Sequence, residues 1–326
     1  MRPITKLTRQ FLGVTLTTLL LASAASAQSW PDHALRLVVP FAPGGGSDVL
    51  ARLIADPLAQ RLGQPIIIDN KPGANATIGA DFVAKAPADG YTLLFTPPGP
   101  QITNPSLMAK LPYDPVRDLT PVARLGVFVA VLVVHPSVPA RNIGELIAYA
   151  KANPGKLNFS SPGIASANHL GGEYLKFLAG IDIVHVPYKG SAPALQDLLA
   201  GRVQMTIDTL AALLPQINAG ALRPIAIAAL DRSPNLPDLP TIAETMEGFD
   251  ASSLAYLSVR SGTQPAIIER LNRELNTVLA TPALRARLLD LGIMPKPGTP
   301  NEIARQVEQE RQKWKKVIEA AGIKPE

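Results

Sequence analysis

"PFAPGGGSDVLARLI" (residues 40–54) places three consecutive glycines between an apolar run and a helical pattern. Glycine is costly to order, but it lets the backbone turn tightly and bring its N–H groups close to a ligand. The start of a helix adds unsatisfied N–H donors and a partial positive charge. The stretch therefore predicts a site for an anion such as a carboxylate or a phosphate. The alternative interpretation is a tight strand-to-helix turn with Ser47 as its N-cap.

Known glycine motifs differ from this stretch at identifiable positions. The dinucleotide-binding pattern G-x-G-x-x-G and the nucleophile elbow G-x-S-x-G both need glycine where the chain has Val49. The P-loop needs G-K-[ST], and residues 189–191 read KGS instead. No serine, histidine and acid fall into a hydrolase framework, and no carboxylate pair suits a glycosidase. The sequence thus predicts binding without turnover.

A second stretch, "LNFSSPGIASANHLGGEYL" (residues 157–175), repeats the arrangement. A strand over 157–161 meets a Pro-Gly turn, and Ser166 is placed to cap the helix that follows. Two helix N-termini that face one cleft would hold an anion from both sides. The repetition strengthens the prediction of an anion site.

Strand-like and helical segments alternate along most of the chain. Three apolar runs within residues 34–96 are separated by helical patterns, which predicts βαβ units and a buried parallel sheet. Pro57 is expected to kink the first helix or to end it early. Near the C-terminus, Thr299, Pro300 and Glu302 predict the capped start of a last helix.

Two long extended runs divide the alternation into two lobes. The run over 123–136 leads out of the first lobe, and the run over 252–261 leads back. We expect residues 28–126 and 252–326 to form the first lobe and residues 127–251 to form the second. Each lobe is predicted to be a mostly parallel sheet flanked by helices, with the two crossing strands as a hinge.

Residues 1–27 are read as a secretory signal peptide that is cut after Ala27. Arg2, Lys6 and Arg9 precede a 12-residue apolar stretch, which is followed by small residues. A membrane anchor or a buried helix is the alternative interpretation. Removal of these three cations lowers the formal net charge from +5 to +2.

Composition excludes several classes of partner. The remaining Lys and Arg are scattered, so the chain lacks the basic stripe of a nucleic-acid-binding protein. The chain has no cysteine, and its four histidines show no metal-ligand spacing. The sequence therefore predicts neither a metal nor a cofactor.

Candidate ligand-binding residues follow the predicted strands, because ligands of open α/β sheets bind beyond the carboxyl ends of strands. Asp208 is placed to accept a hydrogen bond from a ligand, or else to cap a helix. His169 either contacts the ligand or serves as a core or capping residue. The complete candidate set is Phe41, Ala42, Pro43, Gly44, Gly45, Gly46, Ser47, Asp48, Ala76, Thr77, Thr96, Pro97, Gly99, Ser160, Ser161, Gly163, Ala165, Ser166, His169 and Asp208.

Several long stretches resemble one family. They are "WPDHALRLVVPFAPGGGSDV" (30–49), "NPSLMAKLPYDPVRDLTPVA" (104–123), "HVPYKGSAPALQDLLAGRVQM" (185–205) and "RSPNLPDLPTIAE" (232–244). The chain resembles the Bug proteins, the periplasmic solute receptors of tripartite tricarboxylate transporters, over essentially all residues after the predicted signal peptide. The resemblance implies a two-lobed periplasmic-binding-protein fold, type II-like, with a carboxylate held by backbone N–H groups and bridging waters.

The same resemblance implies roles for the candidate residues. One half of the site is Phe41 to Asp48, and the other is Ser160 to Ser166 with His169 behind it. Asp208 and the 96–101 loop line the variable end. The chain departs from many relatives at Pro97, Pro98, Pro100 and Ala165, and this more apolar wall suits an aromatic or aliphatic body.

The resemblance also implies partners. It implies a monomeric receptor that delivers its ligand to an inner-membrane permease of one large and one small subunit. A ligand sensor that signals to a two-component kinase is the first alternative. An exported hydrolase is the second, although only a cleft and serines favour it.

Overall fold

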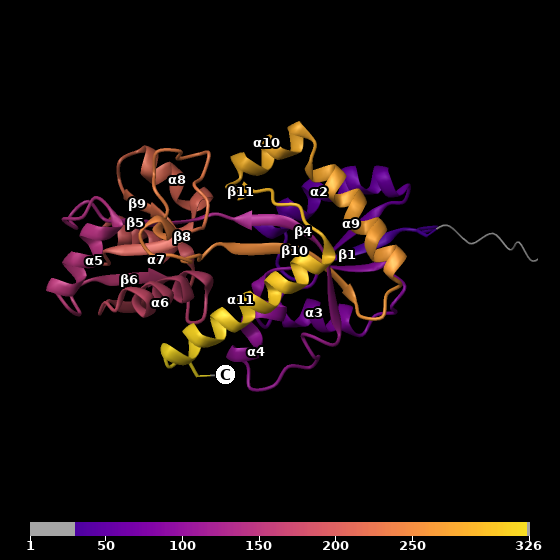
Figure 1. Ribbon diagram of the computed structural model, residues 1–326, viewed down its shortest axis with the longest axis horizontal. Coiled ribbons are helices and arrows are strands. Elements are labelled where there is room, and N and C mark those ends of the chain that lie inside the picture. Colours follow the sequence, from indigo (N-terminus) through magenta and orange to yellow (C-terminus); the bar gives the residue numbers. More distant parts are fainter. Residues whose placement is uncertain (1–29, 325–326) are drawn as a thin grey trace, which may run out of the picture.

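The protein is described by a computed structural model over residues 30–324, and the predicted signal peptide lies outside this range. Two α/β lobes lie side by side (Figure 1). The first contains a six-stranded sheet in the order β11-β4-β10-β3-β1-β2. Its strands are β1 (Leu35–Val39), β2 (Ile66–Asn70), β3 (Thr92–Thr96), β4 (Leu119–Phe128), β10 (Ser253–Arg260) and β11 (Ile293–Met294).

The second lobe contains a five-stranded sheet in the order β7-β6-β8-β5-β9. Its strands are β5 (Ala130–Val134), β6 (Asn158–Ser161), β7 (Val184–Pro187), β8 (Met205–Thr209) and β9 (Arg223–Ile227). Alternate side chains of β5 pack on opposite faces of the sheet, with Leu132 and Val134 in one buried cluster and Val131 and Val133 in the other. All five strands of this sheet lie between residues 130 and 227.

Both sheets are mixed, whereas the sequence indicated mostly parallel sheets. β1 is parallel to β2 and β3, and β6 is parallel to β7 and β8. β10 pairs antiparallel with both β3 and β4. The physical reason is the crossing itself: β4 leaves the first lobe and β10 returns to it, so the two neighbours run in opposite directions.

The predicted crossings are present, and the extended run over 123–136 is divided between two strands. Only Val129 separates β4 of the first sheet from β5 of the second. Beside this junction, Phe128 pairs with Ser253 of β10 and with Ile293 of β11. The ends of three strands therefore meet where the two lobes join.

Helices cover both faces of the sheets. In the first lobe they are α2 (Gly46–Leu62), α3 (Thr77–Ala84), the π-helix η1 (Gly99–Thr103), α4 (Asn104–Leu107), α9 (Pro265–Leu279) and α10 (Pro282–Asp290). The second lobe has α5 (Ile143–Ala152), α6 (Ala167–Ala179), α7 (Ser191–Leu199), α8 (Leu210–Asn218) and the 3₁₀ helix η2 (Ile242–Glu244). Across residues 30–324, every helix is too short or too polar to traverse a bilayer.

Helix α2 does not end early at Pro57, which was one of the two effects expected of this proline. The helix continues through this proline and ends only at Gly63, which has a left-handed conformation. Leu50, Ile54 and Leu58 are fully buried on the inner face of α2. This packing holds the helix together although Pro57 donates no backbone hydrogen bond.

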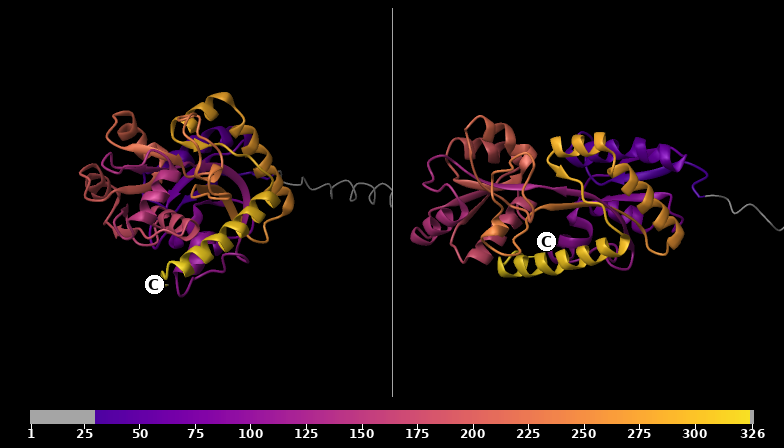
Figure 2. Two further views of the ribbon diagram at one scale, coloured as in Figure 1. Left: turned by 60° about the vertical axis from the view of Figure 1, so that its left-hand side comes forward. Right: turned by 45° about the horizontal axis from the view of Figure 1, so that its top comes forward.

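The last helix, α11 (Pro300–Ala320), spans both lobes. It begins with the predicted capping box, in which Thr299 and Glu302 exchange hydrogen bonds. It packs on β4 and η1 of the first lobe and on α6 of the second, and Figure 2 shows it running along one side of the molecule. One continuous cluster of buried apolar side chains includes Ile102 and Leu107 of the first lobe, Phe159 and Leu175 of the second, and Trp314 and Ile318 of α11.

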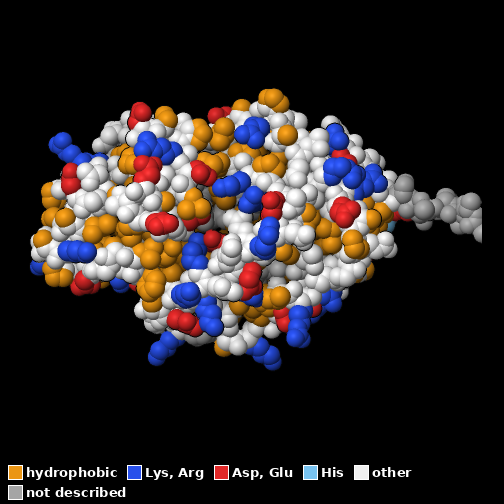
Figure 3. Space-filling model, in the orientation of Figure 1, with side chains coloured by type: hydrophobic (Ala, Val, Ile, Leu, Met, Phe, Trp, Pro, Cys, Tyr) orange, Lys and Arg blue, Asp and Glu red, His pale blue; other side chains and the backbone are white. Residues whose placement is uncertain are grey.

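The surface carries both signs of charge. On the face drawn in Figure 3, basic and acidic side chains alternate over both lobes. Ion pairs among the charged side chains include Arg232 with Glu244 and Arg202 with Asp197.

Candidate functional site

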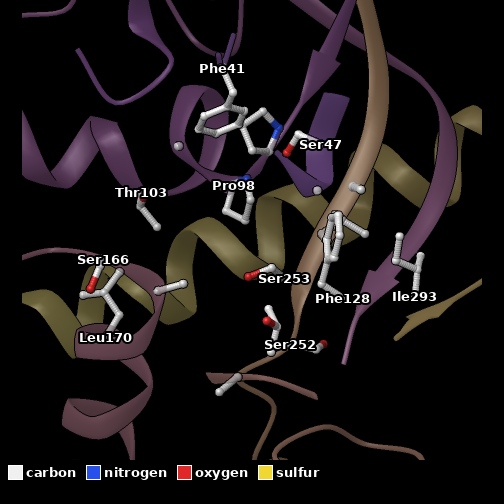
Figure 4. A pocket seen from close by; sticks show the side chains of 18 of the residues that line it. Phe41, Ser47, Pro98, Thr103, Phe128, Ser166, Leu170, Ser252, Ser253 and Ile293 are labelled. Carbon is white, nitrogen blue, oxygen red and sulfur yellow. The ribbon is translucent and has the colours of Figure 1, made fainter. Parts of the chain in front are cut away.

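A cavity of about 580 Å³ lies between the lobes, and we call it the interlobe cavity. It is lined by the loop after β1 and the first turn of α2, and by the loops after β2 and β3. The second lobe contributes the first turn of α6 and the turn between β8 and α8. Phe128, the start of β10 and Trp314 of α11 complete the wall (Figure 4). A volume of this size is typical of small-molecule sites.

The glycine loop forms the first-lobe side of the cavity. Gly44 adopts a positive φ of 85°, which a side chain rarely tolerates. Gly45, and not Ser47, is the N-cap of α2, and no side chain caps this helix. The first N–H groups of α2 thus remain free for a ligand. A Cβ atom on Gly46 would lie 3.7 Å from Cε1 of Phe128, so the aromatic ring stands beside these donors.

Asp48 is buried beneath the glycine loop and does not line the cavity. Its carboxylate accepts hydrogen bonds from Gly44 N at 3.0 Å, Arg52 Nε at 2.9 Å and Asn70 Nδ2 at 2.9 Å. The bond from Arg52, followed by that from Gly44, lowers the Asp48 pKa to about 2. Asp48 therefore holds the loop in place as an anion near neutral pH.

The second-lobe side is the turn before α6. Ser166 is the N-cap of α6, as predicted, and its hydroxyl accepts a hydrogen bond from His169 N and donates one to Gly163 O. Ala165 has a positive φ of 60°. Ala165, Ser166 and Ala167 all line the interlobe cavity. A second helix N-terminus therefore borders the same space as the first.

His169 lies behind this turn and not in the cavity. Its Nδ1 accepts a hydrogen bond from Ala165 N at 3.0 Å, and its ring stacks on His185 with 3.7 Å between centroids. Nε2 of His185 in turn lies 2.7 Å from the Ser161 hydroxyl. Burial lowers the pKa of both histidines to about 4, so both rings are neutral near pH 7. In this structure His169 has the capping and core role that was the alternative interpretation.

Asp208 lines a different cavity, a small one of about 190 Å³ within the second lobe. Ser160, Ser161 and Asn168 line the same small cavity. Asp208 accepts a hydrogen bond from Thr209 N at 2.6 Å, and burial raises its pKa. The N-cap of α8 is Thr209, so Asp208 does not cap that helix.

The loops after β2 and β3 form the remaining first-lobe wall. Pro97, Pro98 and Gly99 line the cavity, whereas Thr96 is buried and bonds to Ser258. From the other loop Asn75 lines the cavity, in place of the predicted Ala76 and Thr77. Ala74, Asn75 and Ala76 are consecutive residues with positive φ. The buried Asn104 side chain holds this strained turn, because its Nδ2 donates to Asn75 O.

Seven of the predicted residues meet at the interlobe cavity: Phe41, Gly46, Ser47, Pro97, Gly99, Ala165 and Ser166. The other thirteen lie outside its lining: Ala42, Pro43, Gly44, Gly45, Asp48, Ala76, Thr77, Thr96, Ser160, Ser161, Gly163, His169 and Asp208. Residues that the sequence did not single out also line it, among them Phe128, Leu170, Ser252, Ser253, Ile293 and Trp314. Phe128 and Ser253 belong to the predicted crossings, and that position between the lobes is a signal that could have identified them.

Among the described residues that line the interlobe cavity, none is Asp, Glu, Lys, Arg or His, so the lining side chains carry no formal charge. Its polar side chains are hydroxyls and the amide of Asn75, and most of its wall is apolar. The positive potential available to an anion therefore comes from the helix N-termini in the wall, which are those of α2, α6 and α8.

Comparison with known proteins gives consistent likenesses. Residues 50–323 match the family model described as "Tripartite tricarboxylate transporter family receptor". The chain is 38% identical to the protein BugT of Bordetella pertussis over 96% of this chain and 97% of that one. A solved structure of an R. palustris protein with adipate is 40% identical, with a TM-score of 0.76 over 91% of this chain and 100% of that one. The periplasmic binding protein BugD is 32% identical, with a TM-score of 0.72 over 91% and 100% of the two chains. These likenesses confirm the predicted two-lobed fold.

Proposed function

The chain belongs to the tripartite tricarboxylate transporter receptor family, and from this premise we propose that it binds a small organic carboxylate in the interlobe cavity. One observation carries the proposal: two helix N-termini, one from each lobe, border a single cavity. Helix N-termini present unpaired N–H donors together with a partial positive charge, which is what a carboxylate needs.

Binding would proceed by closure of the lobes on the ligand. The free N–H groups at Gly46 and Ser47 receive the carboxylate on one side, and those of the α6 turn receive it on the other. Asp48 and His169 act behind these turns, since each fixes a backbone N–H of its loop. The hinge consists of the two crossings, with residues 28–126 and 252–326 as one lobe and residues 127–251 as the other.

The receptor would work outside the cytoplasm and without catalysis. Cleavage after Ala27 releases it into the periplasm, where it presents the ligand to a permease of one large and one small subunit. The family is one of solute receptors, which supports a role in binding and not in turnover.

A thermal-shift screen against mono- and dicarboxylic acids tests the proposal. A ligand at 100 times its Kd stabilises the protein by about 2.7 kcal/mol, which raises the melting temperature measurably. Gly46→Val blocks the N-terminus of α2 and is expected to abolish the shift. The matched control is Gln60→Val, because Gln60 is exposed on the same helix away from the cavity. A shift that survives Gly46→Val would remove this helix end from the site.

A further inference from the structure

Helix α11 carries a carboxylate on the face that it buries. Ile303, Val307, Trp314 and Val317 repeat at helical spacing and are buried. Glu310 falls on the same stripe, and its side chain is only 17% exposed. Removing a carboxylate from water is costly unless the group is paired and hydrogen-bonded. The contacts of Glu310 must therefore offset that cost.

The Glu310 carboxylate contacts two side chains of the next helical turn. Its Oε2 accepts a hydrogen bond from Trp314 Nε1 at 2.9 Å, and its Oε1 accepts one from Lys313 Nζ at 2.8 Å. Trp314 lines the interlobe cavity. A buried indole N–H needs a hydrogen-bond partner. The Glu310 carboxylate therefore fixes how the Trp314 ring lies in the cavity wall.

Lys313 extends this contact to another segment of the wall. Its Nζ also donates to Asp250 O at 2.9 Å and lies 5.7 Å from the ring centroid of Tyr174 of α6. Asp250 Oδ1 accepts hydrogen bonds from Ser252 N at 2.9 Å and from Ser252 Oγ at 2.5 Å. Ser252 lines the interlobe cavity (Figure 4). A continuous path of polar contacts thus joins Trp314 to Ser252, two wall residues from different segments of the chain.

The ion pair between Glu310 and Lys313 contributes little net stability. The Lys313 side chain is 18% exposed, so both charges are largely withdrawn from water. Replacing such a pair by apolar side chains of similar volume is often neutral or stabilising. Two leucines would cover the core at least as well. The pair is therefore explained better by the arrangement that it fixes than by the stability that it adds.

We propose that Glu310 is a positioning residue of the interlobe cavity, which holds the Trp314 ring directly and the segment from Asp250 to Ser252 through Lys313. The inference rests on the proposed function and adds to it residues that lie outside the cavity lining. The wall is then ordered before a ligand arrives, which lowers the cost of ordering it on binding.

A measurement without ligand tests the contact itself. Trp30→Phe leaves Trp314 as the sole tryptophan of the chain, so a ¹⁵N-labelled protein shows one indole N–H resonance. Glu310→Leu combined with Lys313→Leu removes both charges together and leaves no unpaired ion. We expect the indole proton of this double variant to shift upfield, because its bond to the carboxylate is lost. An unshifted resonance would overturn the inference.

Two single variants complete this measurement. Glu310→Gln keeps an acceptor oxygen for Trp314 Nε1 and is expected to keep the resonance near its wild-type position. Glu319→Leu is the matched control, because the Glu319 side chain is 64% exposed on the same helix. A shift in Glu319→Leu as large as that in the double variant would contradict a specific role of Glu310.

The pH dependence of the same resonance identifies the titrating group. Burial raises the pKa of Glu310 above its ordinary value of 4.5; the Lys313 ammonium opposes this rise and the Asp250 carboxylate adds to it. Burial also raises the pKa of Tyr174, so its hydroxyl stays neutral in this range. We expect the wild-type resonance to shift as the pH falls and Glu310 takes up a proton, and the Glu310→Gln resonance to stay in place. An equal shift in Glu310→Gln would assign the titration to another group and overturn the inference.

Calorimetric titration with adipate at pH 7.5 tests the consequence for binding. Adipate is the probe because it is present in the structure of a relative that is 40% identical. We expect the double variant to bind adipate about three- to tenfold more weakly than the wild type, while its melting temperature changes little. Wild-type affinity in the double variant would overturn the inference and leave the carboxylate receptor intact.

Two other results of this titration have separate meanings. A parallel loss of affinity and melting temperature would show a purely structural role, which also overturns the inference. If the wild type bound neither adipate nor any acid of the thermal-shift screen, the proposed function would fall and this inference with it.

Discussion

Asp48→Asn is the most direct test of how the glycine loop is held. Three donors converge on the Asp48 carboxylate, from Gly44, Arg52 and Asn70. An asparagine of the same shape offers one acceptor oxygen and turns an amide N–H₂ toward the remaining donors. The variant therefore loses the charged hydrogen bonds and leaves a buried donor unpaired.

The magnitude follows from the Asp48 pKa. Its value of about 2 lies roughly two units below that of an unperturbed aspartate, and each unit is worth about 1.4 kcal/mol. The Arg52 partner is 55% exposed, so solvent screens part of the interaction. We expect Asp48→Asn to lower the free energy of unfolding by about 1–2 kcal/mol at pH 7.

The pH dependence has a defined sign. Because the folded-state pKa of Asp48 is lowered, its stabilisation is fully present above the unfolded-state pKa near 4 and is lost as the pH falls toward 2. Urea unfolding of the wild type and the variant is compared at pH 7 and at pH 3, where the difference is expected to be roughly halved. The control is Asp56→Asn, at an exposed position of α2. The reasoning is refuted if Asp48→Asn unfolds like the wild type at pH 7, or if its deficit is unchanged at pH 3.

Three further predictions concern the second lobe. Gly172→Ala is expected to destabilise the protein by about 1–3 kcal/mol in urea unfolding, because the new Cβ would lie 2.2 Å from Phe159 Cε2. A variant as stable as the wild type would show that α6 can move away from Phe159. The free energy of unfolding is expected to decline as the pH falls from 6.5 to 4, because the imidazoles of the unfolded chain take up protons before buried His169 and His185 do. His185→Gln is expected to flatten this decline. An equally steep pH profile in the variant would contradict the prediction. Ala165→Gly is expected to raise the unfolding free energy by about 0.5–1 kcal/mol, since it removes a left-handed alanine; a lower melting temperature would disprove this strain.

Local signals predicted local structure well. Thr299 and Glu302 lie at capping-box spacing, and they cap α11 in the structure as predicted. Ser166 caps α6, as expected of a serine placed just before a helical pattern. The weaker predictions involve packing over longer range: α2 does not end early at Pro57, and α8, which contains Pro215, was anticipated only as the helix that Asp208 was placed to cap. In both helices a proline interrupts the local pattern, while buried neighbours stabilise the helix.

The candidate site was predicted at the level of loops more accurately than at the level of side chains. The sequence placed Asp48 and Asp208 at strand-to-helix junctions but did not show which way their side chains point. Asp208 and Thr209 illustrate the difficulty, since these consecutive residues open into different cavities. The position of Phe128 at the cavity depends on how β4 pairs with β10 and β11. This pairing joins segments more than a hundred residues apart, so the sequence pattern around Phe128 does not reveal it.

Helix α11 has a consequence for how the molecule unfolds. The apolar cluster that contains Trp314 continues without a break from Ile102 in the first lobe to Phe159 in the second. Neither lobe can unfold without exposing part of the core that it shares with the other lobe. Unfolding of one lobe therefore destabilises the other. We therefore expect the two lobes to unfold as a single cooperative unit.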